Sequence, residues 1–146
     1  MTLDASVWLA AISTGEREHA ALIESLVERC VPLQQPGLFV IEVCATIARR
    51  TRNRTLALAA GDATLASPYL TLYPLNHALA SEAAHLAATC ALRGADAVYV
   101  ATARHAGATL LTLDAEVRER ASGDVAVHTP DEWATGMTRD TNIDKV

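Results

Sequence analysis

Short apolar stretches alternate along this chain with longer segments in which apolar residues recur every three to four positions. The segment 38–50 is the clearest of the longer kind, because its apolar residues from Val40 to Ala48 fall on one face of a helix. The stretch Thr109–Leu113 is the strongest of the short kind and predicts a strand. The alternation therefore predicts strands that are separated in the sequence by helices.

The same reading over the whole chain gives a fold class. It predicts strands at 1–3, 31–35, 70–75, 109–113 and 125–128, and helices at 6–13, 14–30, 38–50, 55–67, 78–93, 96–105 and 115–121. Strands separated by helices pair in parallel through right-handed crossovers. We therefore expect an α/β fold, a three-layer α/β/α sandwich with a central, mostly parallel sheet. A single domain is expected over residues 1–135, followed by a polar, flexible tail at 136–146.

Composition narrows the possible functions. Of the 146 residues, 51% are hydrophobic and 20% are charged, which excludes an intrinsically disordered chain. A net charge of −5 argues against a general nucleic-acid binder but is compatible with a local basic patch. No apolar window reaches the roughly 20 residues of a membrane span, and the N-terminus does not resemble a signal peptide. The three cysteines lack CxxC spacing. We therefore expect reduced thiols in a cytoplasmic protein with no membrane partner.

Four carboxylates are predicted to meet at one edge of the sheet. Asp4 and Asp114 directly follow strands, Asp96 opens a helix, and Glu42 lies in the second turn of another helix. In a parallel α/β sheet the carboxyl ends of strands and the N-termini of crossover helices share one edge, where ligands bind. The four residues are far apart in the sequence, so the fold alone can bring them together.

Each carboxylate also has a purely structural interpretation. Aspartate is a favoured N-cap, so Asp4, Asp96 and Asp114 could each simply begin a helix. Glu42 could be a solvated surface residue, although Phe39 and other apolar neighbours make that half of its helix apolar nearly all round. A glutamate in such surroundings is expected to enter a cleft.

Clustered carboxylates predict a divalent cation and phosphate chemistry. Oxygen ligands suit Mg²⁺ or Mn²⁺ better than zinc, and the chain offers no paired histidines or cysteines for zinc. Such an ion can activate water and polarise a phosphoryl oxygen. Phosphoaspartyl transfer is disfavoured, because Asp4 lacks a DxD partner and the sole lysine is Lys145. Nucleotide-binding loops and a serine-nucleophile elbow are absent from the sequence.

Several segments together resemble a known family. They are LDASVWLA at 3–10, IEVCATIARR at 41–50, GADAVYVATARHAGATLLTLD at 94–114 and the final VAVHTP strand. In this order they resemble a PIN domain, and most closely the VapC-type toxin ribonucleases of type II toxin–antitoxin pairs. The resemblance implies a Mg²⁺- or Mn²⁺-dependent endoribonuclease, usually dimeric, that a cognate antitoxin holds inactive.

The resemblance also assigns residues. The family's acids, which bind metal and position water, map onto Asp4, Glu42, Asp96 and Asp114. Thr112 occupies the family's Ser/Thr position, where its hydroxyl would support the acids or hold a water, although it can equally be an ordinary strand threonine. Glu116 matches a position that is acidic in some relatives, but a first-turn helix acid is the simpler interpretation.

Arginines offer candidates for RNA binding. Arg49 lies two helical turns after Glu42 and, with Arg50, belongs to the one dense basic cluster. Arginine forks pair well with phosphate, but the same residues can simply favour a helix C-terminus. Arg93, one turn before Asp96, could pair with that acid or with phosphate.

Two alternative functions remain open from the sequence. A catalytically silent PIN-like module would use its acids as helix caps while binding RNA or protein, and a housekeeping nuclease would process RNA without being a toxin. Intact acids favour an enzyme, and a short chain without an appended RNA-binding domain favours a toxin.

Overall fold

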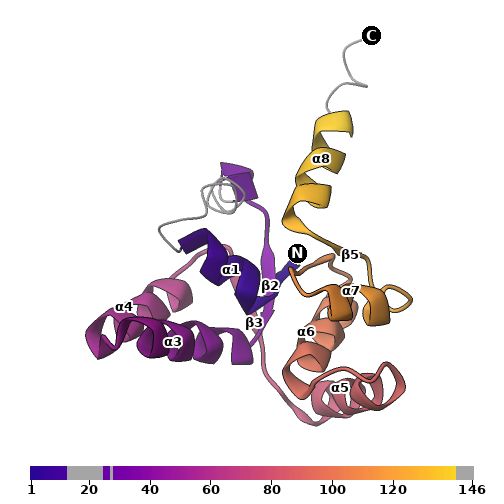
Figure 1. The fold of residues 1–146 in the computed structure, drawn as a ribbon, viewed down its shortest axis with the longest axis horizontal. Coiled ribbons are helices and arrows are strands. Elements are labelled where there is room, and N and C mark those ends of the chain that lie inside the picture. The colour runs from indigo at the N-terminus through magenta and orange to yellow at the C-terminus, as the bar shows by residue number, and fades with distance from the viewer. Residues whose placement is uncertain (13–24, 27, 141–146) are drawn as a thin grey trace.

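The computed structural model describes residues 1–12, 25, 26 and 28–140, in which short strands alternate with helices (Figure 1). The strands are β1 (Thr2–Leu3), β2 (Leu33–Pro36), β3 (Leu70–Tyr73), β4 (Leu110–Leu111) and β5 (Val127–His128). The helices are α1 (Ala5–Ile12), α3 (Leu38–Thr51), α4 (Arg54–Leu65), α5 (His77–Thr89), α6 (Gly94–His105), α7 (Ala115–Ala121) and α8 (Pro130–Asp140). The helix predicted at 14–30 lies largely outside the described residues.

The strands of the described residues pair in parallel. β4 lies between β1 and β5, with Thr2 opposite Leu110 and Leu110 opposite Val127. β2 pairs with β3 in a second group. The two groups meet where the Gln34 N–H donates to the carbonyl oxygen of Met1 at 2.7 Å. The predicted α/β class with a parallel sheet is confirmed.

A buried side chain joins β1 to β2. Gln35 is fully buried and its amide faces the backbone of Leu3. When the amide nitrogen is placed at the Leu3 carbonyl, it donates to that oxygen at 3.0 Å, and the amide oxygen accepts from the Leu3 N–H at 2.9 Å. The side chain therefore supplies hydrogen bonds that a longer strand ladder would otherwise make.

Helices cover the strands on both sides, with α1, α3 and α4 on one side and α5, α6 and α7 on the other (Figure 1). Neighbouring strand residues point to opposite faces. Leu110 joins the larger cluster, which contains buried residues of α5, α6 and α7 and also of α1 and α3, whereas Leu111 packs with Leu3, Val7 and Leu26. Burial of these side chains on both faces fixes the end of β1 beside the end of β4.

Two helix boundaries differ from the predictions. The helix predicted at 78–93 ends earlier, because α5 stops at Thr89, and the helix predicted at 96–105 begins earlier, at Gly94. Helix α8 was not predicted, and it includes residues 136–140 of the expected tail. Its start carries a capping box, in which Thr129 and Glu132 bond to each other's backbone N–H at 2.9 and 3.1 Å.

None of the helices that the structure describes is long and apolar enough to cross a membrane.

Candidate functional site

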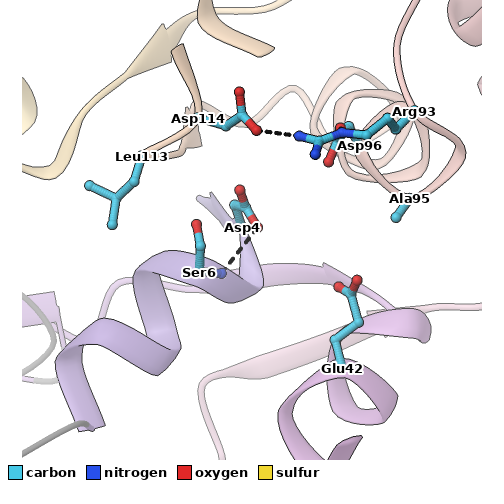
Figure 2. Close-up of a pocket in the computed structure, with 8 residues that line it drawn as sticks. All are labelled: Asp4, Ser6, Glu42, Arg93, Ala95, Asp96, Leu113 and Asp114. Atoms are coloured by element: carbon cyan, nitrogen blue, oxygen red, sulfur yellow. Dashed lines mark hydrogen bonds and ion pairs between the residues drawn. The ribbon is translucent and has the colours of Figure 1, made fainter. Parts of the chain in front are cut away.

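The four predicted carboxylates line one pocket of about 480 Å³ at the carboxyl edge of the sheet. Asp4 follows β1, Asp114 lies three residues after β4, Asp96 sits in the first turn of α6, and Glu42 projects from α3. Figure 2 shows these side chains directed toward the same opening, with Asp4 between Asp114 and Glu42. The fold brings together the acids that the sequence placed on one edge. Ser6, Arg93, Ala95 and Leu113 complete the lining.

Asp4 is held by hydrogen bonds at both carboxylate oxygens. Its Oδ1 accepts from the Ser6 N–H at 3.1 Å, and its Oδ2 accepts from the Thr112 hydroxyl at 2.7 Å. Thr112 is fully buried, and its Oγ1 also accepts from the Asp114 N–H at 3.0 Å. This threonine therefore links the acids that follow two adjacent strands.

Helix capping explains part of the acid arrangement. Asp114 is the N-cap of α7, and its Oδ1 accepts from the N–H groups of Glu116 and Val117 at 2.8 and 3.3 Å. Asp96 is not a cap, because Arg93 is the N-cap residue of α6. The capping interpretation therefore applies to Oδ1 of Asp114 and to Oδ1 of Asp4, which accepts from the second N–H of α1, and it leaves Asp96 without a capping role.

Arg93 bridges two of the acids. Its Nε donates to Oδ2 of Asp96 at 2.7 Å, and its Nη2 pairs with Oδ2 of Asp114 (Figure 2). The sequence predicted that Arg93 could pair with Asp96 or with phosphate, and the structure shows the pairing with Asp96. The sequence did not predict the pairing with Asp114. These two contacts raise the pKa of Arg93, Asp96 contributing most. A single guanidinium thus serves as the cation of the pocket.

Glu42 has a partner inside the protein. Its Oε2 accepts a hydrogen bond of 2.5 Å from the hydroxyl of Tyr99, a residue of α6 that is almost wholly buried. Burial raises the pKa of Glu42, and the negative charges of Asp4 and Asp96 act in the same direction, while the Tyr99 bond opposes them. The cleft position expected for Glu42 matches its half-buried state.

The two remaining carboxyls differ electrostatically. Burial raises the pKa of Asp96 despite its contact with Arg93. Burial acts on Asp114 in the same sense, but the N–H groups at the start of α7 and the Arg93 guanidinium hold its pKa below the usual range. The pocket therefore combines two carboxyl groups of raised pKa, Glu42 and Asp96, with one of lowered pKa, Asp114.

The donor set fits a hard divalent cation. The pocket presents carboxylate oxygens from four residues, and among the described residues that line it Arg93 is the one cation that offsets the repulsion among them. Oxygen donors with surplus negative charge favour Mg²⁺ or Mn²⁺. As the side chains stand, no group of three or more acid, histidine or cysteine residues in the described part of the chain is arranged to hold an ion. The chemistry of the ligands fits, and their final positions require side-chain movement.

The other residues that the sequence singled out, Arg49, Arg50 and Glu116, lie at different places relative to the acid pocket. Arg49 is close enough to Glu42 for its charge to lower that residue's pKa, and it also donates to the Thr46 hydroxyl at 3.2 Å. Arg50 lines a second pocket between α1, α3 and α4, away from the acids. Glu116 does not line the acid pocket and pairs with Arg120 at 2.5 Å.

Sequence reasoning did not identify Tyr99. The signal was available, because Tyr99 lies three residues after Asp96 on the same helix and within the buried run 97–103. A buried tyrosine hydroxyl usually has a hydrogen-bond partner. The polar neighbour could therefore have been expected, although its identity as Glu42 depends on the tertiary fold.

Comparison with known proteins identifies the family. Residues 1–123 match the PIN domain. This chain belongs to the PIN domain family. No protein with a curated description matches it.

Several solved structures share the fold of this chain. One chain of FitAcB from Neisseria gonorrhoeae superposes with a TM-score of 0.70 at 21% identity, over 88% of this chain and 96% of that one. A toxin–antitoxin complex from Klebsiella pneumoniae gives 0.65 at 18%, over the same shares. VapBC2 from Rickettsia felis, bound to a DNA fragment from its promoter, gives 0.68 at 13%, again over 88% and 96%.

Proposed function

We propose that the acid pocket of this PIN domain is the active site of a metal-dependent endoribonuclease that hydrolyses RNA phosphodiester bonds. PIN domains are typically nucleases. The observation that carries the proposal is the Thr112 hydroxyl, which ties Asp4 to the backbone of Asp114, two residues that line one pocket together with Asp96 and Glu42. Helix capping alone needs no such link between two strands.

Each side chain then has a defined task. Asp4, Asp96, Asp114 and Glu42 would hold Mg²⁺ or Mn²⁺, which when bound would polarise a phosphoryl oxygen and lower the pKa of a nearby water. Thr112 fixes the orientation of Asp4. Tyr99 fixes Glu42, whose pKa is raised by burial, so that this carboxylate can accept a proton from the attacking water.

Arg49 is the better of the two predicted phosphate contacts. It lies on α3 beyond Glu42, and its side chain is exposed. A guanidinium at this place can pair with an RNA phosphate that reaches the pocket. Arg50 would contact RNA only if the bound RNA also extended along the second pocket, which Arg50 lines.

Replacement of Asp96 tests the catalytic proposal. With Mg²⁺ or Mn²⁺, we expect Asp96→Asn to cleave a single-stranded RNA at least about 100-fold more slowly than the wild type, because a nearly isosteric amide loses the charge that the reaction uses. Asp124→Asn is the matched control, since Asp124 also pairs with an arginine, Arg104, but lies outside the pocket.

The opposite result has a clear meaning. If Asp96→Asn cleaves RNA as fast as the wild type, the residue is not catalytic and a PIN-like binding module becomes the better proposal.

We further propose that the nuclease is the toxin of a toxin–antitoxin pair, and that it forms homodimers. The structural neighbours include toxin–antitoxin complexes, which supports the proposal. An apolar groove of about 710 Å³ between α1, α3 and α4 offers a place for a protein partner, with Trp8, Val43, Ile47 and Leu56 in its walls. Leu56 is 49% exposed, as expected for a surface that a partner covers.

Growth separates a toxin from a housekeeping nuclease. Induced expression of this chain should arrest bacterial growth, and co-expression of the small protein encoded beside its gene should restore it. Asp96→Asn should not arrest growth. Normal growth on induction of the active protein would contradict the toxin assignment while leaving the nuclease proposal intact.

A further inference from the structure

We propose that Arg93 competes with the divalent cation for the acid pocket: it holds Asp96 and Asp114 in the metal-free protein and must release them when the cation binds. The inference rests on the proposed function, because it concerns the same carboxylates. It adds a control on metal binding that is built into the chain itself.

The bridge occupies one oxygen of each of two acids that would hold a cation. Oδ1 of Asp114 is committed to the first N–H groups of α7, so Oδ2 is the oxygen left for a ligand. Arg93 pairs with that Oδ2. It also takes Oδ2 of Asp96 at 2.7 Å. A cation that binds both residues through these oxygens must therefore displace the guanidinium.

The position of Arg93 allows it to leave. Its side chain is 64% exposed, whereas those of Asp96 and Asp114 are 18% and 28% exposed. As the N-cap residue of α6, it makes no side-chain capping hydrogen bond that would be lost. The positive end of the helix dipole lies beside it and disfavours a cation there. Exposed ion pairs contribute little stability, so the contacts of Arg93 can be exchanged.

The charge balance provides the driving force for exchange. One guanidinium faces the carboxylates of Asp4, Glu42, Asp96 and Asp114, so the pocket keeps surplus negative charge while Arg93 is in place. A divalent ion offsets more of that charge than a single guanidinium does. The surplus also explains why Arg93 stays inside the pocket when no metal is bound.

Metal binding to the intact chain tests the proposal without any RNA. We would titrate MnCl₂ into wild type, Arg93→Gln, Arg93→Lys and Arg104→Gln by isothermal titration calorimetry. Arg104 is the matched control, because it also bridges two carboxylates, Glu82 and Asp124, at 3.4 and 3.3 Å on the same helix. Arg104→Gln therefore removes the same charge and a similar bridge away from the pocket.

The expected result is a selective gain in affinity. Arg93→Gln should lower the Kd for Mn²⁺ on the order of 3- to 10-fold, the range that exposed ion pairs can supply. Arg104→Gln should leave the Kd for Mn²⁺ within about 2-fold of the wild-type value, because salt screens the charge of Arg104 at the opposite end of α6 from the pocket. Arg93→Lys should fall between, since an ammonium keeps the charge but lacks the fork that spans two carboxylates.

The proposal is overturned if the Kd of Arg93→Gln for Mn²⁺ is equal to or higher than that of the wild type. An unchanged Kd with a raised KM for RNA would make Arg93 a phosphate contact instead. Should Arg93→Gln fail to fold, Arg93→Lys decides by the same criterion.

The failure of this inference can be told apart from failure of the proposed function. If the wild type binds Mn²⁺ and cleaves RNA while the Arg93 variants bind it equally well, only the competition is rejected. If the wild type binds no Mn²⁺, the metal-dependent nuclease and the competition fall together.

Discussion

Helix α6 has an arginine at each end that bridges two carboxylates. At its start, Arg93 joins Asp96 to Asp114, and in its last turn Arg104 joins Glu82 to Asp124. Both arginine side chains are more than half exposed. The two ends therefore share a local chemistry, although only one of them lies in the acid pocket.

The surroundings of each bridge make the difference. At the start of α6, Asp4 and Glu42 add carboxylates, and burial raises the pKa of Asp96. Arg93 also lies at the end of the helix whose dipole disfavours a cation, whereas Arg104 lies at the end that favours one. An arginine–acid bridge is therefore an ordinary surface feature, and the added carboxylates together with an unfavourably placed arginine indicate a ligand site.

The largest expected effect separates the two roles of Asp114. Asp114→Asn and Asp114→Ala should both lose at least about 100-fold in RNA cleavage rate, because each removes the carboxylate charge. Asparagine still caps a helix, so only the alanine variant should also lose about 1 kcal/mol of unfolding free energy, measured in urea. At the other end of α6, Asp124→Asn should change the rate by less than about 2-fold. Full cleavage by Asp114→Asn would reduce this residue to a cap.

A smaller effect is expected at Tyr99. Tyr99→Phe leaves the Glu42 carboxylate without its donor and should lower kcat about 10-fold, in line with the value of a hydrogen bond to a charged group. The control is Tyr73→Phe near the other end of α6, where the Tyr73 ring meets the ring of His105 edge-on at 5.6 Å and phenylalanine keeps that ring. A loss of stability with unchanged kcat would make Tyr99 purely structural.

The smallest effect concerns pH and Glu42. Because burial raises the pKa of Glu42, the folded protein binds this proton more tightly than the unfolded chain does. Stability should therefore fall as the pH rises from the ordinary glutamate pKa, about 4.3, through the raised value. Glu42→Gln should flatten this decline in metal-free thermal unfolding curves, whereas Glu82→Gln should keep it. Identical curves for Glu42→Gln and wild type would contradict the expectation.

Periodicity was sufficient to predict most of the fold. Core strands and crossover helices bury repeating apolar positions, and such patterns are visible in the sequence. The start of α8 carried a readable signal, Thr129 and Glu132 in capping-box spacing, which the polar composition of that segment obscured. The boundary between α5 and α6 was harder, because the turn depends on a left-handed backbone at Ala91 with φ of 52°, a conformation that alanine rarely adopts.

The acids of the candidate site could be predicted from the sequence, but the side chains that hydrogen-bond to them could not. Strand ends and helix starts follow from topology, so the shared edge of Asp4 and Asp114 could be inferred. The bond between Tyr99 and Glu42 joins residues 57 positions apart, and the contact from Arg93 to Asp114 spans 21. Such contacts depend on side-chain directions after packing, which periodicity does not encode.

The amide of Gln35 has a consequence for the spacing of the acids. β1 has only two residues, so few backbone bonds set its alignment against its neighbours. The Gln35 side chain makes hydrogen bonds to both backbone polar groups of Leu3, the residue before Asp4. If the register of β1 shifted by one residue, both hydrogen bonds would break and a core side chain would point to the opposite face of the sheet. Gln35 therefore fixes the alignment of β1 against β2, and with it the place of Asp4 at the edge of the acid pocket.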